Sequence, residues 1–307
     1  MNTRVPRLTV VDNVVVDLVT RVQRLPSRGH DELSSSTACY VGGAFNVMSA
    51  ATRLGLRTRY GGLVGTGPFG VLATNALRRE GIESLHGAVA ESDTGLVVTL
   101  IEPDAERTFV TSLGAEATLR PEHVASLNLI AGDTLYFSGY ALLLEPNRST
   151  LTALVRSLPE AVTLVFDPGP LVAQIDTSAL EIVLTRVDWL SCNRREGLSL
   201  SGEDSPTKAA TKLRNRLTRP GVIVRDAERG CVVAWKDRCA QVEGISVVAR
   251  DASGAGDCHV GAFVASLARG HDPFESARIA NTAAAFCVAH WGPASGPTSE
   301  QLAPLLA

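Results

Sequence analysis

The most informative stretch of this sequence is Asp251-Ala252-Ser253-Gly254-Ala255-Gly256-Asp257. The β-branched segment Gly244–Ala249 before it predicts a strand, and Val260, Phe263, Val264 and Leu267 after it follow helical spacing up to Gly270. Small residues at a helix start let the backbone approach a ligand closely and direct free N–H groups at it. The stretch therefore predicts an anion site, above all for phosphate.

Asp257, at the end of this stretch, has two interpretations. An Asp in the first turn of a helix is commonly a cap. A carboxylate beside a phosphate site also suits a general base that takes a proton from an attacking hydroxyl. Gly254, Ala255 and Gly256 favour the second interpretation.

Outward from this stretch, short β-branched runs alternate with amphipathic helices such as Val47–Leu54 and Val71–Glu80. This alternation predicts an α/β fold with a mainly parallel sheet flanked by helices. The predicted strands are Leu8–Val11, Val14–Val22, Arg59–Val64, Leu96–Ile101, Thr134–Ser138, Thr163–Asp167, Trp189–Cys192, Val222–Arg225 and Cys231–Ala234.

Two regions break the alternation. Residues 14–40 form a long extended stretch with no helix, and residues 96–113 read as two strands around the turn Glu102-Pro103-Asp104-Ala105-Glu106. Both predict antiparallel strands that pair into a small sheet apart from the main body.

A second glycine turn, Gly42-Gly43-Ala44-Phe45-Asn46, also opens a helix, and taken alone it is equally consistent with a simple tight turn. Asp17 lies among valines, and a carboxylate at the end of an apolar strand needs a partner. A vicinal diol would supply two hydrogen-bond donors. An exposed Asp at a strand end explains the segment equally well.

A third glycine turn, Gly65-Thr66-Gly67-Pro68-Phe69-Gly70, matches the dinucleotide pattern G-x-G-x-x-G, with Glu91 and Asp93 about 20 residues further on. It does not lie in the first strand-turn-helix unit, and Pro68 removes an N–H group that a pyrophosphate would use. A nicotinamide-dependent oxidoreductase is therefore the weaker alternative.

Composition narrows the class of protein. The 307 residues carry a net charge of −3, which gives no reason to expect nucleic acid or an anionic membrane as partner. Only Lys208, Lys212 and Lys236 are lysines, and none follows a glycine, so a P-loop is absent. Six scattered cysteines and six dispersed histidines form no metal-ligand pattern. Met1-Asn2-Thr3-Arg4-Val5-Pro6 lacks the apolar core of a signal peptide, so a cytoplasmic protein is expected.

With these motifs in order, the sequence resembles the ribokinase-like (PfkB) family of carbohydrate kinases over nearly its whole length. Residues 251–257 match the C-terminal signature D-T-x-G-A-G-D, residues 42–46 match the N-terminal double-glycine signature, and Asn193-Arg194-Arg195-Glu196 matches N-x-x-E. Residues 100–104 and 135–140 look most like a bacterial branch known only as sugar kinases. The resemblance implies a large α/β nucleotide-binding domain (residues 1–13, 41–95 and 114–307) and a small β lid (residues 14–40 and 96–113).

The resemblance also implies roles for individual residues. Asp257 would be the base, and the N–H groups of the Gly254-Ala255-Gly256-Asp257 turn would form the anion hole. Gly42 would belong to the sugar site with the residues that hold sugar hydroxyls, namely Asp17, Gly43 and Asn46. Asn193 and Glu196 would organise magnesium and the phosphates, Glu196 through water. Asp251 would hold a monovalent cation such as potassium, and Arg225, Gly230 and Asn281 lie where the family builds its nucleotide site.

Some positions depart from the family. Asp12 stands where a glycine is common, and Val15 and Ala44 stand where ribokinases have Asn and Lys, which puts ribose itself in doubt. Arg225–Gly230 corresponds to the family's T-x-G-x-x-G but lacks its Thr and its first Gly. Residues 65–70 correspond to a different family motif, G-x-D-x-x-G.

The leading hypothesis is thus ATP- and magnesium-dependent transfer of a phosphoryl group to a hydroxymethyl group of a sugar or nucleoside. The main alternative is a catalytically idle sugar-binding regulator on the same fold. A homodimer through the exposed edge of the lid is also expected.

Overall fold

The computed structural model describes residues 5–104, 106–219 and 221–306. Two sequence predictions fall partly outside the described residues. They concern residues 1–4, in the segment that lacks a signal peptide core, and Ala105, in the expected turn between two strands. Within that part of the chain, no helix is both long and apolar enough to span a bilayer.

The main sheet has nine strands in the order β13-β12-β11-β10-β9-β8-β1-β4-β5, counted over the described residues. All neighbours are parallel except the two pairs that β12 makes. The strands are β1 (Arg7–Val10), β4 (Arg57–Tyr60), β5 (Glu83–Ser84), β8 (Thr134–Ser138), β9 (Thr163–Asp167), β10 (Trp189–Asn193), β11 (Gly221–Arg225), β12 (Cys231–Trp235) and β13 (Arg238–Val242).

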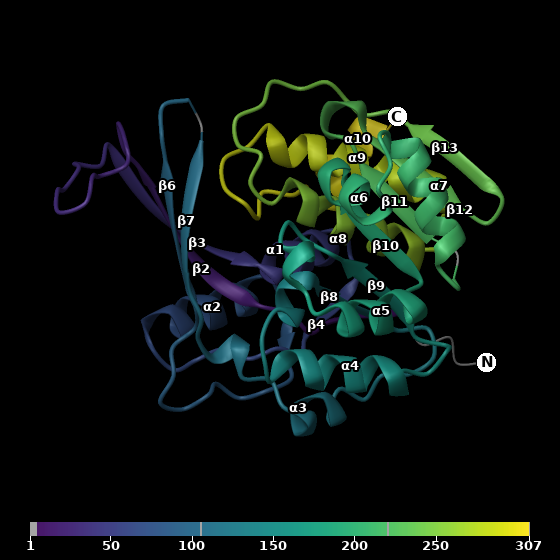
Figure 1. The fold of residues 1–307 in the computed structure, drawn as a ribbon, viewed down its shortest axis with the longest axis horizontal. Coiled ribbons are helices and arrows are strands. Elements are labelled where there is room, and N and C mark those ends of the chain that lie inside the picture. The colour runs from purple at the N-terminus through teal and green to yellow at the C-terminus, as the bar shows by residue number, and fades with distance from the viewer. Residues whose placement is uncertain (1–4, 105, 220, 307) are drawn as a thin grey trace.

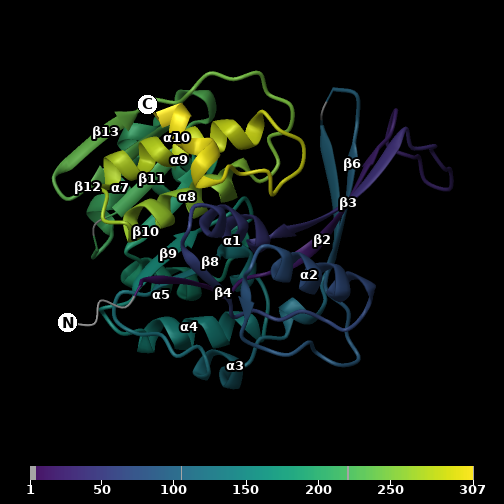
Figure 2. The same cartoon turned by 180° about the vertical axis from the view of Figure 1, so that it is seen from behind.

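Helices cover both faces of this sheet, as Figures 1 and 2 show from opposite sides. One layer consists of α1 (Ala44–Arg53), α2 (Pro68–Arg79), α8 (Ala255–Ala268), α9 (Pro273–Val288) and α10 (Ser299–Leu306). The other layer consists of α3 (Pro121–Ala125), α4 (Asn147–Ser157), α5 (Thr177–Arg186), α6 (Arg194–Ser201) and α7 (Pro206–Arg216). Each layer buries its own hydrophobic core against the sheet, and the predicted α/β fold is confirmed.

Short 3-10 helices follow several strands. They are η1 (Ala115–Ala117), η2 (Gly139–Leu142), η3 (Val172–Gln174) and η4 (Ala227–Arg229). Of these, η2 directly follows β8 and contributes to one wall of the cavity described below.

A separate four-stranded sheet in the order β3-β2-β6-β7 stands off the main body, at the left of Figure 1. We call this sheet the lid; it contains β2 (Val14–Arg21), β3 (Ser36–Gly43), β6 (Leu96–Ile101) and β7 (Arg107–Ser112). Its two hairpins are antiparallel, as predicted, and β2 joins them by parallel pairing with β6. Strand β3 continues to Gly43, past residue 40; the division of the chain into two domains stays a prediction.

One predicted strand is wrong. Residues 244–249 lie in an irregular segment between β13 and α8, with Val248 85% exposed. The edge of the main sheet is formed instead by β13, whose polar residues gave no strand signal. Alternating β-branched residues therefore predicted a strand where the fold supplies no neighbouring strand to pair with it. The first helix, α1, begins earlier than predicted, directly after Gly43, and β4 ends at Tyr60.

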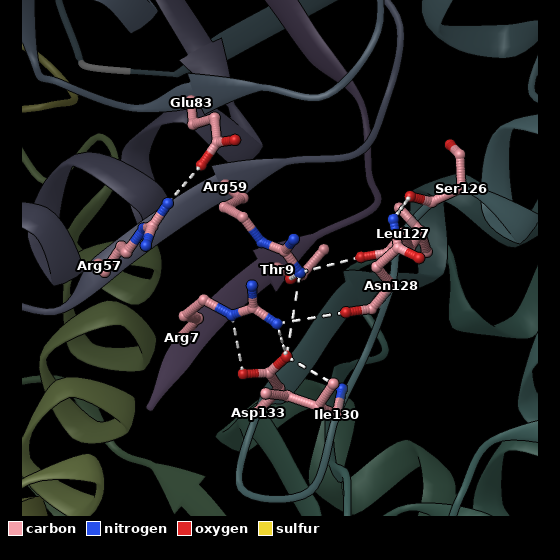
Figure 3. A network of polar contacts seen from close by, with 10 residues as sticks. All are labelled: Arg7, Thr9, Arg57, Arg59, Glu83, Ser126, Leu127, Asn128, Ile130 and Asp133. Atoms are coloured by element: carbon pink, nitrogen blue, oxygen red, sulfur yellow. Dashed lines mark hydrogen bonds and ion pairs between the residues drawn. The ribbon is translucent and has the colours of Figure 1, made fainter. Parts of the chain in front are cut away.

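A buried charged cluster lies at the amino-terminal end of the central strands (Figure 3). Arg7 donates through Nε to Asp133 Oδ1 at 3.0 Å, and the Arg59 guanidinium lies 4.0 Å from Asp133 Oδ2. Arg59 also donates to Thr9 Oγ1 and to the Leu127 carbonyl oxygen. These side chains tie β1, β4 and the start of β8 to the chain that precedes β8.

Candidate active site

The opposite, carboxyl-terminal edge of the parallel strands faces a cavity of about 1360 Å³. Asp12 follows β1, Asp167 ends β9 and Arg225 ends β11, so three separate strands deliver charged side chains to this edge. The start of α8 and the inner face of the lid form further walls. Ligands of open α/β sheets bind at this edge, so the cavity is the candidate site.

The start of α8 has the geometry expected of an anion site. Gly254 precedes the helix with a φ of 70°, and a Cβ there would lie 2.0 Å from the Pro293 carbonyl oxygen, so only glycine fits. Ala255, Gly256 and Asp257 are the first three helical residues, whose N–H groups have no acceptor earlier in the helix, although the Ala255 N–H donates to the Ala252 carbonyl oxygen at 3.4 Å. The Asp257 carboxylate lies in this first turn and lines the cavity.

Asp257 is joined to the N-terminal glycine turn. Asn46, in the first turn of α1, donates through Nδ2 to Asp257 Oδ2 at 2.8 Å. The structure thus brings together two motifs that are separated by 211 positions. Burial raises the pKa of Asp257 to about 7; Asp167 and Asp12 also raise it, whereas the Asn46 hydrogen bond and Arg225 lower it. A carboxylate with this pKa accepts a proton readily near neutral pH.

Unpaired acceptors surround the base. Asn13 Oδ1 and Asn46 Oδ1 are buried, with no hydrogen-bond partner among the described residues, and both side chains line the cavity. Because an unpaired buried acceptor costs free energy, such atoms mark a place for a ligand that donates hydrogen bonds. Hydroxyl groups are ligands of that kind.

Asp17 adds a carboxylate to these acceptors from the inner face of the lid. It lies in the middle of β2 and not at a strand end, so both sequence interpretations placed it wrongly along the strand. Burial raises the pKa of Asp17 to about 6. Gly42 packs directly beneath it, since a Cβ on Gly42 would lie 2.0 Å from Asp17 Oδ2.

On the other side of Asp257, acids gather around one arginine. Arg225 donates to Asp167 Oδ2 at 2.8 Å and lies 3.9 Å from Glu196 Oε2. Burial and Asp167 raise the pKa of Glu196, while Arg225 lowers it. Asn193 and Glu196 form a reciprocal capping box at the start of α6, with Asn193 Oδ1 accepting from the Glu196 N–H and Glu196 Oε2 accepting from the Asn193 N–H. The motif therefore fixes the Glu196 carboxylate in the cavity wall.

Asp251 lies before the helix start and is held by the backbone. Its Oδ1 accepts from the Ser253 N–H at 2.9 Å, and its Oδ2 accepts from the Gly292 N–H at 3.2 Å. Arg107 of the lid approaches Asp251 Oδ1 at 3.7 Å. Although burial opposes it, the hydrogen bonds and Arg107 hold the pKa of Asp251 below its ordinary value, so the carboxylate is charged.

Gly230 and Asn281 do not line this cavity. Asn281 donates to the carbonyl oxygens of Val242 and Glu243 and pairs with His259, which ties α9 to the segment after β13. Gly230 has a φ of 84° and packs against the Val242 carbonyl oxygen. In this structure both residues make packing contacts with the end of β13, outside the cavity lining.

The glycine turn 65–70 leads into α2 and leaves little space for a dinucleotide. The Asp93 carboxylate accepts from the N–H groups of Phe69 and Gly70, and a Cβ on Gly67 would lie 2.4 Å from Asp93 Cγ. The acid that a dinucleotide site would offer to ribose thus occupies the position of the pyrophosphate. The oxidoreductase alternative loses its structural basis.

Sequence reasoning missed Asp167 and Arg107 as site residues, and noted Asp12 only as a departure from a family pattern. Asp12 accepts from the Ser138 N–H at 2.8 Å, and burial raises its pKa to about 6. Asp12 and Asp167 each stand at or just after the carboxyl end of a predicted strand, which was a usable signal. The approach of Arg107 to Asp251 depends on how the lid lies over the body, and no pattern in the sequence indicated it.

Comparisons with known proteins agree on one family. The family described as pfkB family carbohydrate kinase matches residues 5–300. A sugar kinase of Escherichia coli, YegV, is 31% identical and covers 98% of this chain and 96% of its own length. Ribokinase of Haemophilus influenzae is 26% identical, with 96% of each chain covered.

Solved structures share the fold. Ribokinase of Thermotoga maritima superimposes with a TM-score of 0.84 at 23% identity, covering 98% of this chain and 99% of the other. Fructokinase of Vibrio cholerae with bound fructose, ADP and potassium gives a TM-score of 0.82 at 22% identity, with both chains fully covered. At these identities the likeness establishes the arrangement of elements alone.

Proposed function

The chain belongs to the pfkB family of carbohydrate kinases and is therefore an ATP-dependent phosphotransferase acting on a sugar or nucleoside alcohol, and we propose that Asp257 is the base of this reaction. The observation that carries the proposal is the contact between Asp257, in the first turn of α8, and Asn46, in the first turn of α1, in the wall of the cavity. A hydroxymethyl group bound there would lie between a proton acceptor and an anion site.

In the proposed mechanism, Asp257 removes the proton from the substrate hydroxyl group. The hydroxyl oxygen attacks the γ-phosphorus of ATP, and ADP leaves. The N–H groups of Ala255, Gly256 and Asp257 stabilise the negative charge on the phosphoryl oxygens, and Gly254 permits the turn that presents them. Asn46 orients the carboxylate through its 2.8 Å hydrogen bond. The lid excludes water, which would otherwise compete as acceptor.

We assign the hydroxyl groups of the sugar or nucleoside to protein oxygen atoms that can accept hydrogen bonds. We assign a vicinal diol to Asp17, whose position is fixed by Gly42, and further hydroxyls to Asn46 Oδ1, Asn13 Oδ1 and the backbone at Gly43. These groups lie on the lid side of Asp257.

The nucleotide phosphates and a divalent cation, proposed to be Mg²⁺, are assigned to the opposite side. Arg225 pairs with Asp167 and lies 3.9 Å from Glu196, and Asp12 and Asp257 line the same cavity, so carboxylate oxygens are available to a hard cation. Bound magnesium would neutralise charge on the transferring phosphoryl group. Glu196, held by Asn193, would bind it through water, and Arg225 would contact phosphate oxygens. Gly230 and Asn281 are assigned to the wall of the nucleotide site.

Potassium is the proposed monovalent cation, with Asp251 as its ligand. The Ser253 and Gly292 N–H groups orient this carboxylate beside the start of α8. Its charged state fits a cation ligand, and the same charge attracts Arg107. Potassium would steady the turn that presents the anion hole.

A homodimer through the lid is proposed from the edges of that sheet. Strands β3 and β7 are its outer strands, and each offers unpaired backbone groups along one side. A small molecule remains the substrate, and no nucleic acid or membrane partner is proposed. The cytoplasmic location also stays a prediction.

The test is acceptor-dependent ADP release from ATP and Mg²⁺, with and without potassium, across a panel of sugars and nucleosides. We expect release with at least one acceptor and none with the same preparation of Asp257→Asn above the background of contaminating kinases. An acceptor that binds in calorimetry while wild-type protein releases no ADP would identify an idle sugar-binding regulator and overturn the proposal.

A further inference from the structure

The inner face of the lid sorts into rows of side chains that can be followed across the sheet. Alternate residues of each strand face the cavity. The register places Tyr40, Asp17, Val97 and Thr111 in one row, and Ala38, Val19, Thr99 and Phe109 in the next row towards the tip. These rows define what an acceptor held by Asp17 would touch.

Asp17 is the single acid in its row, in which Tyr40 and Val97 are its cross-strand neighbours and Thr111 lies one strand further. Tyr40 lies directly opposite it in β3 and Val97 lies opposite it in β6, where cross-strand side chains are in contact. Val15 and Val19 flank it along β2 on the same face. Two hydroxyl groups on Asp17 would therefore lie beside the Tyr40 side chain and the three valines.

The next row is apolar at Ala38, Val19 and Phe109, and its one polar member, Thr99, is 5% exposed. Phe109 is 58% exposed although it lines the cavity, so its ring is available to a ligand. The facing wall is also apolar, with Leu143, Leu144 and Leu171 after η2 and β9. Leu144 is 54% exposed and Leu171 is 36% exposed. Exposed apolar groups on both sides of one cavity favour an apolar, flat occupant between them.

The two lid arginines that line the cavity, Arg21 and Arg107, are directed elsewhere. Arg107 approaches Asp251 at 3.7 Å, and Arg21 lies 5.8 Å from the ring centre of Trp291. Both interactions connect the lid to the large body. A phosphorylated acceptor would have to break them while facing Asp17 and Asp257, which repel it.

The protein's hydrogen-bond acceptors are concentrated at the end of the substrate site away from the lid tip. Asn13 precedes β2 and Asn46 follows β3, so both lie where the lid joins the body, and Asn46 contacts Asp257. Their unpaired oxygens, with Asp17, offer acceptors for a few hydroxyls at one end of a ligand. A free monosaccharide carries hydroxyls all around its ring and would leave several against Val19, Phe109 or the leucines, at the cost of unpaired polar groups.

We propose that the acceptor is a nucleoside, a proposal that rests on the kinase function proposed above. Its hydroxymethyl group lies at Asp257, its ribose diol at Asp17, and its base between the Val19–Phe109 row of the lid and the leucines of the facing wall. The base stacks on Phe109, a contact that tolerates different bases.

The first experiment compares kcat/KM for adenosine, guanosine, cytidine and uridine with that for D-ribose and D-fructose, by ADP release. We expect the best nucleoside to exceed both free sugars by about tenfold to a hundredfold, the contribution of one stacked base. If a free sugar has an equal or higher kcat/KM, the nucleoside proposal is overturned and the kinase function stands. If none of the six compounds supports ADP release, the kinase function itself is overturned.

The second experiment uses neighbouring residues of β7 that face opposite ways. Phe109 lines the cavity, whereas Val110, 60% exposed, points to the other face of the sheet. Phe109→Ala should lower the ratio of nucleoside to free-sugar kcat/KM about tenfold, through KM, and Val110→Ala should leave the ratio unchanged. Because both side chains are exposed, both variants should fold, and their unfolding temperatures confirm it. A ratio that Phe109→Ala does not change, or that both variants change equally, overturns the proposal.

Discussion

The two ends of the main sheet each hold a buried charged cluster, and their charges are balanced differently. At the amino-terminal end, Arg7 and Arg59 surround Asp133 (Figure 3). At the carboxyl-terminal end, Arg225 pairs with Asp167, lies 3.9 Å from Glu196 and lowers the pKa of Asp257, and Asp12 lines the same cavity. β1 contributes to both clusters, with Arg7 at its start and Asp12 just after its end.

The difference lies in how far the charges are satisfied. Asp133 is 1% exposed and accepts from Arg7 and from the Ile130 N–H, so its lone pairs are used within the protein. At the other end Arg225 pairs with Asp167, while burial raises the pKa of Asp257 to about 7 and that of Asp12 to about 6. A satisfied cluster stabilises the fold, whereas an unsatisfied one can bind a cation and take up a proton.

Exchanging the carboxylate for an amide at the carboxyl-terminal end should give the largest effect, a loss of activity. Asp257→Asn should lower kcat by about 10²–10⁴, the range for loss of a general base, while ATP still binds. The measurement is steady-state ADP release together with nucleotide binding by calorimetry. Turnover equal to that of the wild-type protein would remove Asp257 from the mechanism.

The same exchange at the amino-terminal end should affect stability alone. Asp133→Asn leaves Arg7 and Arg59 buried without their counter-charge, which should cost about 3–5 kcal/mol of unfolding free energy. Denaturant unfolding measures the loss, with the exposed Asp237→Asn as matched control. At a temperature where the variant is folded, kcat should equal that of the wild-type protein, and a lowered kcat would connect the two clusters.

The carboxyl-terminal cluster was partly predictable from the sequence, because its members belong to glycine turns and strand ends. The strand-turn-helix around Asp257 and the turn before Asn46 were found from local spacing, and the structure joins them. Asp167 followed a predicted strand in the same way and was overlooked. Asp251 was found through a motif, but its neighbour Arg107 comes from a distant hairpin that no local pattern connects to it.

The amino-terminal cluster gave no such signal. Arg7, Arg59 and Asp133 are separated by up to 126 positions, and charged residues at strand starts usually lie in solvent. The wrong strand at residues 244–249 has a related cause. Its β-branched residues satisfy a local preference, but strand pairing depends on a neighbour that the sequence does not specify.

A pH series should separate the two roles of Asp257. Since its pKa is about 7 and the base must be ionised, kcat should be about tenfold lower at pH 6 than at pH 8. In the unfolded chain the same carboxyl ionises near its ordinary, lower pKa. The folded protein therefore holds the proton more tightly, and this contribution to stability is lost as the pH rises through 7.

It follows that Asp257→Asn should unfold at a higher temperature than the wild-type protein at pH 8, by a margin that shrinks towards pH 5. Paired thermal scans of the two proteins measure this margin, and a constant or growing difference on acidification would contradict a raised pKa. The comparison isolates Asp257 because the other titrating groups are common to both proteins.

The smallest effect should come from the second arginine of the amino-terminal cluster. Arg59 donates to Thr9 Oγ1 at 2.7 Å and to the Leu127 carbonyl oxygen, but burial and repulsion by Arg7 lower its pKa, and its Nε has no partner among the described residues. Arg59→Met removes these costs together with two hydrogen bonds, and it leaves Arg7 and Asp133 as a balanced pair. The unfolding free energy should therefore change by less than about 1 kcal/mol. Arg7→Met, which removes the closer partner of Asp133, should destabilise more; equal losses would mean that Asp133 depends on both arginines alike.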